Sequence, residues 1–299
     1  MDPNNDVVRE FPHLFRVYKD GRIERLLGND TTPPGTDPVT SVDSKDVTVN
    51  PQTGVSLRLY LPPNPAGKLP LLIYIHGGAF CVCSPSNPSY HGHINTVAAR
   101  ANAVVASVHY RLAPEHPLPI AYDDSWEAVK WIGAHAAGTG PEPWLNQHAD
   151  FNNMFLAGDS AGANLAHNMA MRGTEEGFGG LKLQGMVLIH PYFGNESKDQ
   201  LVEYLYPGYA GPDDPKIHAT YDPKLSGLGC PKVLVFISEK DFLRQRGQCY
   251  YEALKKSGWK GVVDIVEFPA EDHVFHLFDP TKEKAEDLVK RFVSFIKQT

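Results

Sequence analysis

The fold of this chain is decided by Gly158-Asp159-Ser160-Ala161-Gly162, which follows four apolar residues at 154–157 and precedes a helix-forming run at 163–166. This order predicts a strand, a tight turn and a helix. In so tight a turn, the residues two positions before and after the serine must lack a Cβ. The turn pushes the Ser160 hydroxyl outward beside a helix N-terminus, whose N–H groups favour a developing negative charge. We therefore predict a nucleophilic serine; the alternative is a glycine-rich helix cap without chemistry.

Short continuous apolar runs occur on both sides of this turn. Such runs are typical of strands that are buried on both faces of a parallel sheet. An earlier strand, 55–61, instead alternates apolar and polar residues, which is the pattern of a half-buried strand. The predicted buried strands are 70–75, 103–108, 154–157, 186–189 and 233–237, and a further strand is expected at 262–268.

Patterns with helical periodicity lie between most of these strands. They cover 121–132, 160–172, 242–256 and 282–297. Strands that alternate with helices predict an α/β fold with a mostly parallel central sheet flanked by helices. No internal repeat or low-complexity segment divides the chain, so we expect a single domain over residues 1–299. Prolines at positions 33, 34 and 38 cannot continue a helix or a central strand, and predict an N-terminal arm that lies over the rest of the protein.

Composition and charge exclude two classes of protein. The 299 residues are 42% hydrophobic and 21% charged, as in globular proteins, and the formal net charge of −7 argues against binding to nucleic acid. The longest apolar stretches are far shorter than the roughly 20 residues that span a bilayer. The first six residues are acidic and polar, unlike a secretory signal, and the four cysteines are too scattered for a disulfide framework. We expect a cytoplasmic protein, either a monomer or a homodimer.

A second loop with two glycines, residues 76–80 (HGGAF), follows the strand at 70–75. Glycines let the backbone approach a substrate oxygen closely, so the N–H groups of Gly77 and Gly78 are predicted to hold an oxyanion together with that of Ala161. Ala79 stands where a third glycine would be expected; it keeps its N–H but disfavours a positive φ, so we do not count it as a donor. The alternative is an ordinary Gly-Gly turn after a strand.

A serine nucleophile needs a base and an acid that orients this base. Asp241 and His273 each follow a predicted strand, where a side chain reaches the carboxyl edge of the sheet. The order Ser160, Asp241, His273 along the chain is the one found with a serine on a turn of this kind. Two alternatives stay open: Asp241 only caps the next helix, or His276 is the base.

Taken together, these stretches resemble the plant carboxylesterases of the hormone-sensitive-lipase type, within the α/β-hydrolase fold. The resemblance extends from about residue 15 to the end of the chain. It implies cleavage of carboxylic esters through an acyl-enzyme on Ser160, without a cofactor or a metal ion. It also implies a cap over the pocket, formed by about residues 1–40 and 194–223, of which the second is shorter than is usual in the family. The matching segments are 76–80 (HGGAF), 110–116 (YRLAPEH), 158–164 (GDSAGAN), 239–244 (EKDFLR) and 272–276 (DHVFH).

Some members of this family do not hydrolyse esters. Gibberellin receptors have lost the base histidine, certain alkaloid cyclases replace it, and hydroxyisoflavanone dehydratases often carry threonine in place of the serine. Ser160, Asp241 and His273 are all intact here, which favours a serine carboxylesterase acting on small, apolar esters. The alternatives are a dehydratase or cyclase of specialised metabolism that uses His273 as its base, and a small-molecule receptor.

Overall fold

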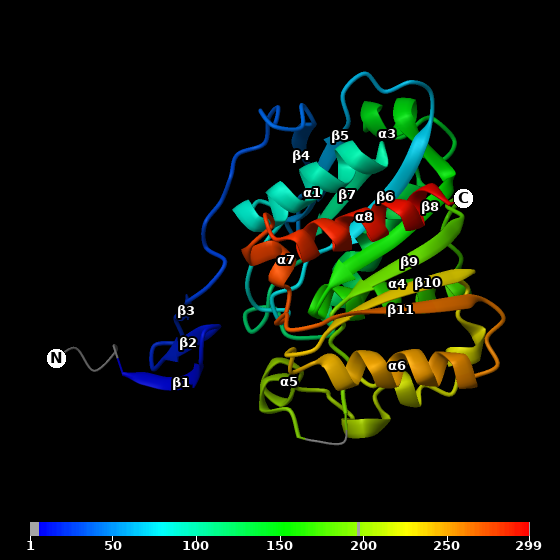
Figure 1. The fold of residues 1–299 in the computed structure, drawn as a ribbon. Coiled ribbons are helices and arrows are strands. Elements are labelled where there is room, and N and C mark those ends of the chain that lie inside the picture. Colours follow the sequence, from blue (N-terminus) through cyan, green and yellow to red (C-terminus); the bar gives the residue numbers. More distant parts are fainter. Residues whose placement is uncertain (1–5, 196–197, 299) are drawn as a thin grey trace.

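The computed structural model of the protein describes residues 6–195 and 198–298 (Figure 1). Residues 1–5 and 196–197, which belong to the two predicted cap segments, lie outside the described residues, as does Thr299. The central sheet consists of β4 (Asp43–Asn50), β5 (Val55–Leu61), β6 (Leu69–Ile75), β7 (Val104–His109), β8 (Ala149–Asp159), β9 (Leu183–Ile189), β10 (Lys232–Ser238) and β11 (Val262–Phe268). Their order is β11-β10-β9-β8-β6-β7-β5-β4. All pairs from β11 to β7 are parallel, whereas β5 is antiparallel to both β7 and β4.

Helices cover both faces of this sheet (Figure 1). They are α1 (Pro88–Ala101), α2 (Ile120–Gly133), α3 (Pro143–His148), α4 (Ala161–Glu176), α5 (Gln200–Leu205), α6 (Arg244–Lys256), α7 (Phe275–Phe278) and α8 (Glu283–Lys297). On one face, α1 and α8 share a hydrophobic core with the strands, and on the other face α2, α4 and α6 do so. The predicted α/β class, with a mostly parallel sheet between two layers of helices, is confirmed. Among the described residues, no helix is long and apolar enough to cross a membrane.

Strand β5 is buried more fully than its alternating sequence predicts. Arg58 and Tyr60, on the side expected to be polar, are 3% and 0% exposed. The guanidinium of Arg58 is paired with Asp46 (Nε to Oδ1, 2.7 Å) and donates to the carbonyl of Thr32 (2.7 Å). The alternation predicts the strand correctly but not its burial, because a buried arginine with partners looks the same in sequence as an exposed one.

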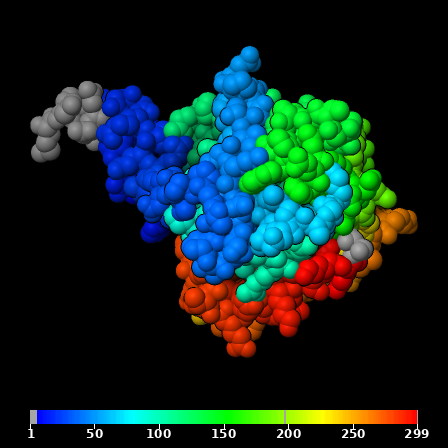
Figure 2. All heavy atoms as spheres, turned by 90° about the horizontal axis from the view of Figure 1, so that it is seen from above, coloured from blue at the N-terminus to red at the C-terminus, as the bar shows by residue number. Residues whose placement is uncertain are grey.

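The N-terminal arm contains a small sheet that the sequence did not predict. Its antiparallel strands are β1 (Val7–Phe11), β2 (Phe15–Tyr18) and β3 (Ile23–Arg25). They lie beside the main body, from which the arm projects in the space-filling view (Figure 2). Phe11 and Phe15 pack in one cluster with Val82 and with Leu205 of α5. The arm and α5 therefore cover the same side of the molecule.

Candidate active site

Ser160 lies in the turn between β8 and α4. Its backbone has φ 51° and ψ −119°, a strained conformation of the kind that occurs at functional sites. A Cβ on Gly158 would lie 2.4 Å from the carbonyl carbon of Gly162, and a Cβ on Gly162 would lie 2.0 Å from the carbonyl oxygen of Ile75. Gly158 is therefore required within the turn itself, as the sequence predicts, whereas Gly162 is required because it packs against the end of β6.

The side chains of Ser160, His273 and Asp241 form a hydrogen-bonded chain. Ser160 Oγ is 3.0 Å from His273 Nε2, and His273 Nδ1 is 2.9 Å from Asp241 Oδ2. Because a carboxylate only accepts, Nδ1 of His273 carries the proton and Nε2 accepts from the serine hydroxyl. This is the geometry in which a histidine can remove the proton of a nucleophilic serine.

The carboxylate of Asp241 holds its own loop as well as His273. Its Oδ1 accepts a hydrogen bond from the N–H of Leu243 at 2.7 Å, and the following helix begins at Arg244, later than the sequence predicts. The side chain of Asp241 is 0% exposed. The N-cap of α6 is Leu243, without a side-chain cap hydrogen bond, so Asp241 does not cap the helix. One oxygen of its carboxylate holds the turn before α6, and the other contacts His273.

The other histidine of the same loop does not contact Ser160. His276 is 1% exposed, and its ring lies edge-on to that of His93, with centroids 4.9 Å apart. Neither of its ring nitrogens has a hydrogen-bond partner among the described residues. Of the two histidines weighed as the base, only His273 is in position to take a proton from Ser160.

A histidine that the sequence analysis did not single out holds the loop of His273. His190 Nδ1 accepts from the N–H of Val274 at 2.9 Å, and its Nε2 is 2.8 Å from Ser238 Oγ. Burial lowers the pKa of His190 to about 3, so its ring stays neutral. His190, Asp241 and His273 lie close enough together to be considered as metal ligands, but both nitrogens of His190 are already in use. No motif surrounds His190, so the sequence carried no signal for this role.

The loop 76–80 differs from the prediction at Gly77. The N–H of Gly77 donates to Tyr90 Oη at 3.0 Å and to Asp159 Oδ1 at 3.2 Å, and it is therefore occupied within the protein. A Cβ at this position would lie 2.4 Å from Asp159 Oδ2. The glycine is thus needed for packing against Asp159, a reason that the motif alone does not disclose.

The next two residues of this loop lie at the cavity in front of Ser160. Gly78 and Ala79 both line it, with φ values of 95° and 52°. Ala79 therefore adopts the positive φ that its Cβ disfavours, contrary to expectation. Ala161, the third predicted donor, is the first residue of α4 and follows Ser160 directly. Because Gly78 and Ala79 line the cavity and Ala161 directly follows the nucleophile, their N–H groups are the candidates for holding a substrate oxygen.

The cavity at Ser160 and His273 has a volume of about 670 Å³ and a mostly apolar wall. The arm, the segment after β9 and the loops next to His273 all contribute to it. Phe242 and Phe278 line it while being 74% and 69% exposed, and large exposed apolar groups beside a cavity mark a binding site. Its volume suits a small molecule. Further apolar lining residues are Leu14, Leu27, Val82, Tyr192, Leu201 and Leu277.

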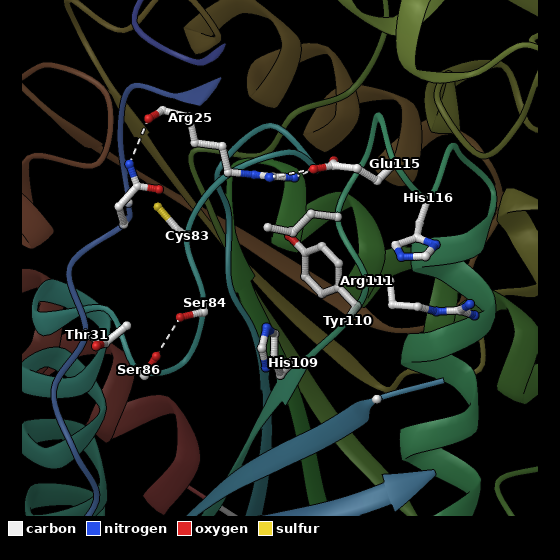
Figure 3. A pocket seen from close by; sticks show the side chains of 14 residues that line it. Arg25, Thr31, Cys83, Ser84, Ser86, His109, Tyr110, Arg111, Glu115 and His116 are labelled. Atoms are coloured by element: carbon white, nitrogen blue, oxygen red, sulfur yellow. Dashed lines mark hydrogen bonds and ion pairs between the residues drawn. The ribbon is translucent and has the colours of Figure 1, made fainter. Parts of the chain in front are cut away.

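A second cavity, of about 530 Å³, adjoins the first across Gly28 and Cys83, which line both. Its lining includes Arg25 of the arm, whose guanidinium is paired with Glu115 (Nη2 to Oε2, 2.6 Å; Figure 3). Arg25 also donates to the carbonyl of Cys81 at 2.7 Å. These contacts fasten the arm to the body beside the cavity of Ser160.

A comparison with protein families shows to which of them the chain belongs. The model of the alpha/beta hydrolase fold family matches residues 72–277, a stretch that includes the loop 76–80 and the residues Ser160, Asp241 and His273. The chain belongs to the alpha/beta hydrolase fold family, and the central sheet and its helical layers are those of this fold.

Individual proteins similar to this chain include enzymes named as esterases and a dehydratase. The chain is 47% identical to probable carboxylesterase 2 of Arabidopsis thaliana over 94% of each chain. It is 43% identical to 2-hydroxyisoflavanone dehydratase of Glycyrrhiza echinata, over 98% of this chain and 97% of that protein. Among solved structures, it is similar to a hyperthermophilic esterase of the archaeon Pyrobaculum calidifontis, with 29% identity and a TM-score of 0.71 over 87% of this chain and 86% of that one. The resemblance inferred from the sequence is confirmed.

Proposed function

We propose that the protein is a serine carboxylesterase that hydrolyses esters of small, apolar molecules through an acyl-enzyme on Ser160. The observation that carries this proposal is the hydrogen-bonded chain from Ser160 through His273 to Asp241, which opens into a mostly apolar cavity. The names of the relatives, a carboxylesterase among plant proteins and an esterase among solved structures, support the same reaction.

In the first half of the reaction, Ser160 Oγ attacks the ester carbonyl carbon while His273 Nε2 takes the serine proton. Asp241 keeps the ring in the required tautomer and stabilises the imidazolium. When the tetrahedral intermediate collapses, His273 gives this proton to the leaving alcohol. Water, activated by the same histidine, then hydrolyses the acyl-serine and restores the enzyme.

The negative charge of the intermediate develops on the former carbonyl oxygen. The N–H groups of Gly78, Ala79 and Ala161 are the donors proposed to hold it, and preorganised donors of this kind typically contribute a factor of about 10²–10³ each. Gly77 is omitted from this set because its N–H is bonded to Tyr90 and Asp159.

The arm and the segment 194–223 are proposed to act as a cap on a single domain over residues 1–299. Leu14 of the arm and Leu201 of α5 both line the cavity of Ser160, which supports a shared role in enclosing the substrate. The proposed reaction needs no cofactor. A cytoplasmic location, and the choice between monomer and homodimer, stay predictions of the sequence analysis.

A second candidate is a dehydratase that uses His273 as the base for an elimination. The 43% identity to a 2-hydroxyisoflavanone dehydratase favours keeping it. In such a reaction Ser160 only forms a hydrogen bond, and no covalent intermediate is made.

Turnover of p-nitrophenyl butyrate, followed by labelling with an organophosphonate and peptide mapping, tests the proposal. We expect hydrolysis and a single adduct on Ser160. An elimination product that still forms in Ser160→Ala would support the dehydratase and contradict the esterase. Tight binding of a small molecule without turnover or labelling would point to the receptor alternative instead.

A further inference from the structure

The carboxylate of Asp159 is buried directly beside the nucleophile without a cationic partner. It is 1% exposed, and no lysine or arginine in the described part of the chain forms an ion pair with it. It instead accepts hydrogen bonds from Tyr74 Oη (2.8 Å), Tyr90 Oη (2.7 Å) and the N–H of Gly77 (3.2 Å). A carboxylate removed from water in this way is costly, and such groups gather at functional sites.

The hydrogen bonds of Asp159 belong to a set of contacts that fix both the N–H and the carbonyl group of Gly77. The N–H of Gly77 is shared between Asp159 and the hydroxyl of Tyr90. Its carbonyl accepts from the hydroxyl of Tyr110 at 3.2 Å and lies 2.8 Å from His76 Nδ1. The ring of His76 stacks on that of Tyr110, with centroids 4.4 Å apart. Both polar backbone groups of Gly77 are therefore fixed before the loop reaches the cavity.

We propose that Asp159 is a positioning residue for the oxyanion donors. By binding the N–H of Gly77, it holds the start of the loop so that the N–H groups of Gly78 and Ala79 face the cavity of Ser160. Asp159 precedes Ser160 in the chain, so one short segment carries both the nucleophile and the anchor of the donors. This inference rests on the proposed ester hydrolysis.

Three substitutions remove parts of this anchor. Asp159→Ala removes both carboxylate oxygens. We expect kcat to fall about 100-fold, because misplaced N–H donors no longer stabilise the oxyanion of the transition state. Asp159→Asn keeps one carbonyl oxygen and should recover part of this loss, with kcat about 10-fold below wild type. Tyr90→Phe removes one donor to Asp159 and one acceptor for Gly77, and we expect a similar loss of about 10-fold. KM for p-nitrophenyl butyrate should stay within about threefold in all three.

Tyr250→Phe is a matched control for Tyr90→Phe. Tyr250 is also fully buried, and its hydroxyl is 3.1 Å from His167 Nδ1, away from the cavity. Removing this hydroxyl should leave kcat unchanged even where thermal unfolding shows a loss of stability. A fall in kcat that follows stability across both variants would overturn the proposal.

A trifluoromethyl ketone provides the decisive measurement. Ser160 Oγ adds to its carbonyl carbon, His273 takes the serine proton, and the carbonyl oxygen becomes the oxyanion. Its inhibition constant should rise in parallel with the loss of kcat/KM in Asp159→Asn and Tyr90→Phe. Binding of p-nitrobutyranilide, a ground-state analogue, should change less than threefold.

If the variants lost equal affinity for the ketone and for p-nitrobutyranilide, or kept full affinity for the ketone, Asp159 would not position the donors. Should Asp159→Asn fail to fold, Tyr90→Phe and its control still decide the question. A failure of the proposed function looks different, because the wild-type protein would then neither hydrolyse p-nitrophenyl butyrate nor be labelled on Ser160.

Discussion

Two turns with glycines meet at the same edge of the sheet, after the neighbouring strands β6 and β8, and they are built in different ways. In the turn after β8, Gly158 and Gly162 lie against each other and against the end of β6, so that Ser160 adopts its strained backbone. In the loop after β6, Gly77 packs against Asp159 and donates its N–H to the interior.

The difference between the two turns is one of sequence distance. The two glycines required at Ser160 lie within two positions of the serine, although Gly162 also packs against the backbone of Ile75 and His76. The loop 76–80 depends on Tyr90, Tyr110 and Asp159, which lie 13, 33 and 82 residues from Gly77. The local motif therefore predicts the first turn, and it predicts only the location of the second.

The largest effect is expected from Ser160→Ala. Loss of the nucleophile should lower kcat for p-nitrophenyl butyrate by about 10⁴-fold or more, because no acyl-enzyme can form. Stability should be preserved, as measured by thermal unfolding. Ser257→Ala, at the end of α6, is the control and should keep full activity. If Ser160→Ala retained a tenth of the wild-type rate, Ser160 would not be the nucleophile.

Gly162→Ala should break the turn at Ser160 itself. Its new Cβ would lie 2.0 Å from the carbonyl oxygen of Ile75 and 2.6 Å from that of His76. Because both contacts are with backbone, we expect a loss of about 3 kcal/mol or more in the free energy of unfolding, measured with urea, together with loss of activity.

Gly92→Ala is the control for this substitution. Gly92 lies within α1, and a Cβ there has nothing within 4 Å. Alanine should stabilise the helix by about 0.5–1 kcal/mol. Equal effects of the two glycine substitutions on stability would contradict the steric account of the turn.

Acid should destabilise the protein through buried histidines, one of which begins the loop 76–80. Burial lowers the pKa of His76, His167 and His190 to about 3, whereas in the unfolded chain each has a pKa near 6.5. Below about pH 6.5 only the unfolded state takes up these protons, so this stability is complete above pH 6.5 and is lost as the pH falls towards 3. Each histidine contributes a slope of up to about 1.4 kcal/mol per pH unit.

Urea unfolding at pH 7 and pH 5 measures this effect. The free energy of unfolding should be lower at pH 5, and His167→Gln should reduce the dependence on pH, because one proton fewer is taken up. Equal stability of the wild-type protein at both values would contradict burial of these three rings in the neutral form.

The smallest effect is expected from Glu115→Gln, which weakens the contact between the arm and the body. The pair with Arg25 is partly exposed, with side chains 21% and 42% accessible, so we expect a loss of at most about 0.5 kcal/mol. KM should rise no more than about threefold, since the cavity keeps its apolar wall. A large loss of kcat would show that the arm acts on the chemistry as well as on binding.

Most strands and helices of the core were predictable because their signals are local, whereas β4 and α1 were not predicted. Continuous apolar runs mark the buried strands, and helical periodicity marks α2, α4, α6 and α8. Two further features that the sequence did not predict have a common cause. The burial of Arg58 and the support of His273 by His190 both depend on partners far away in the sequence, and no local pattern reports such partners.

The sequence by itself determined most of the strands and helices of the central sheet and its flanking layers, the turn that carries Ser160, and the three residue types of the hydrogen-bonded chain. Only the tertiary structure decided which histidine reaches Ser160, that the N–H of Gly77 in the loop 76–80 is bonded within the protein, and how the arm and α5 come to line one cavity. The physical reason is that apolar periodicity and backbone sterics act within a few residues. Hydrogen-bond partners, by contrast, are chosen among all groups that folding brings together.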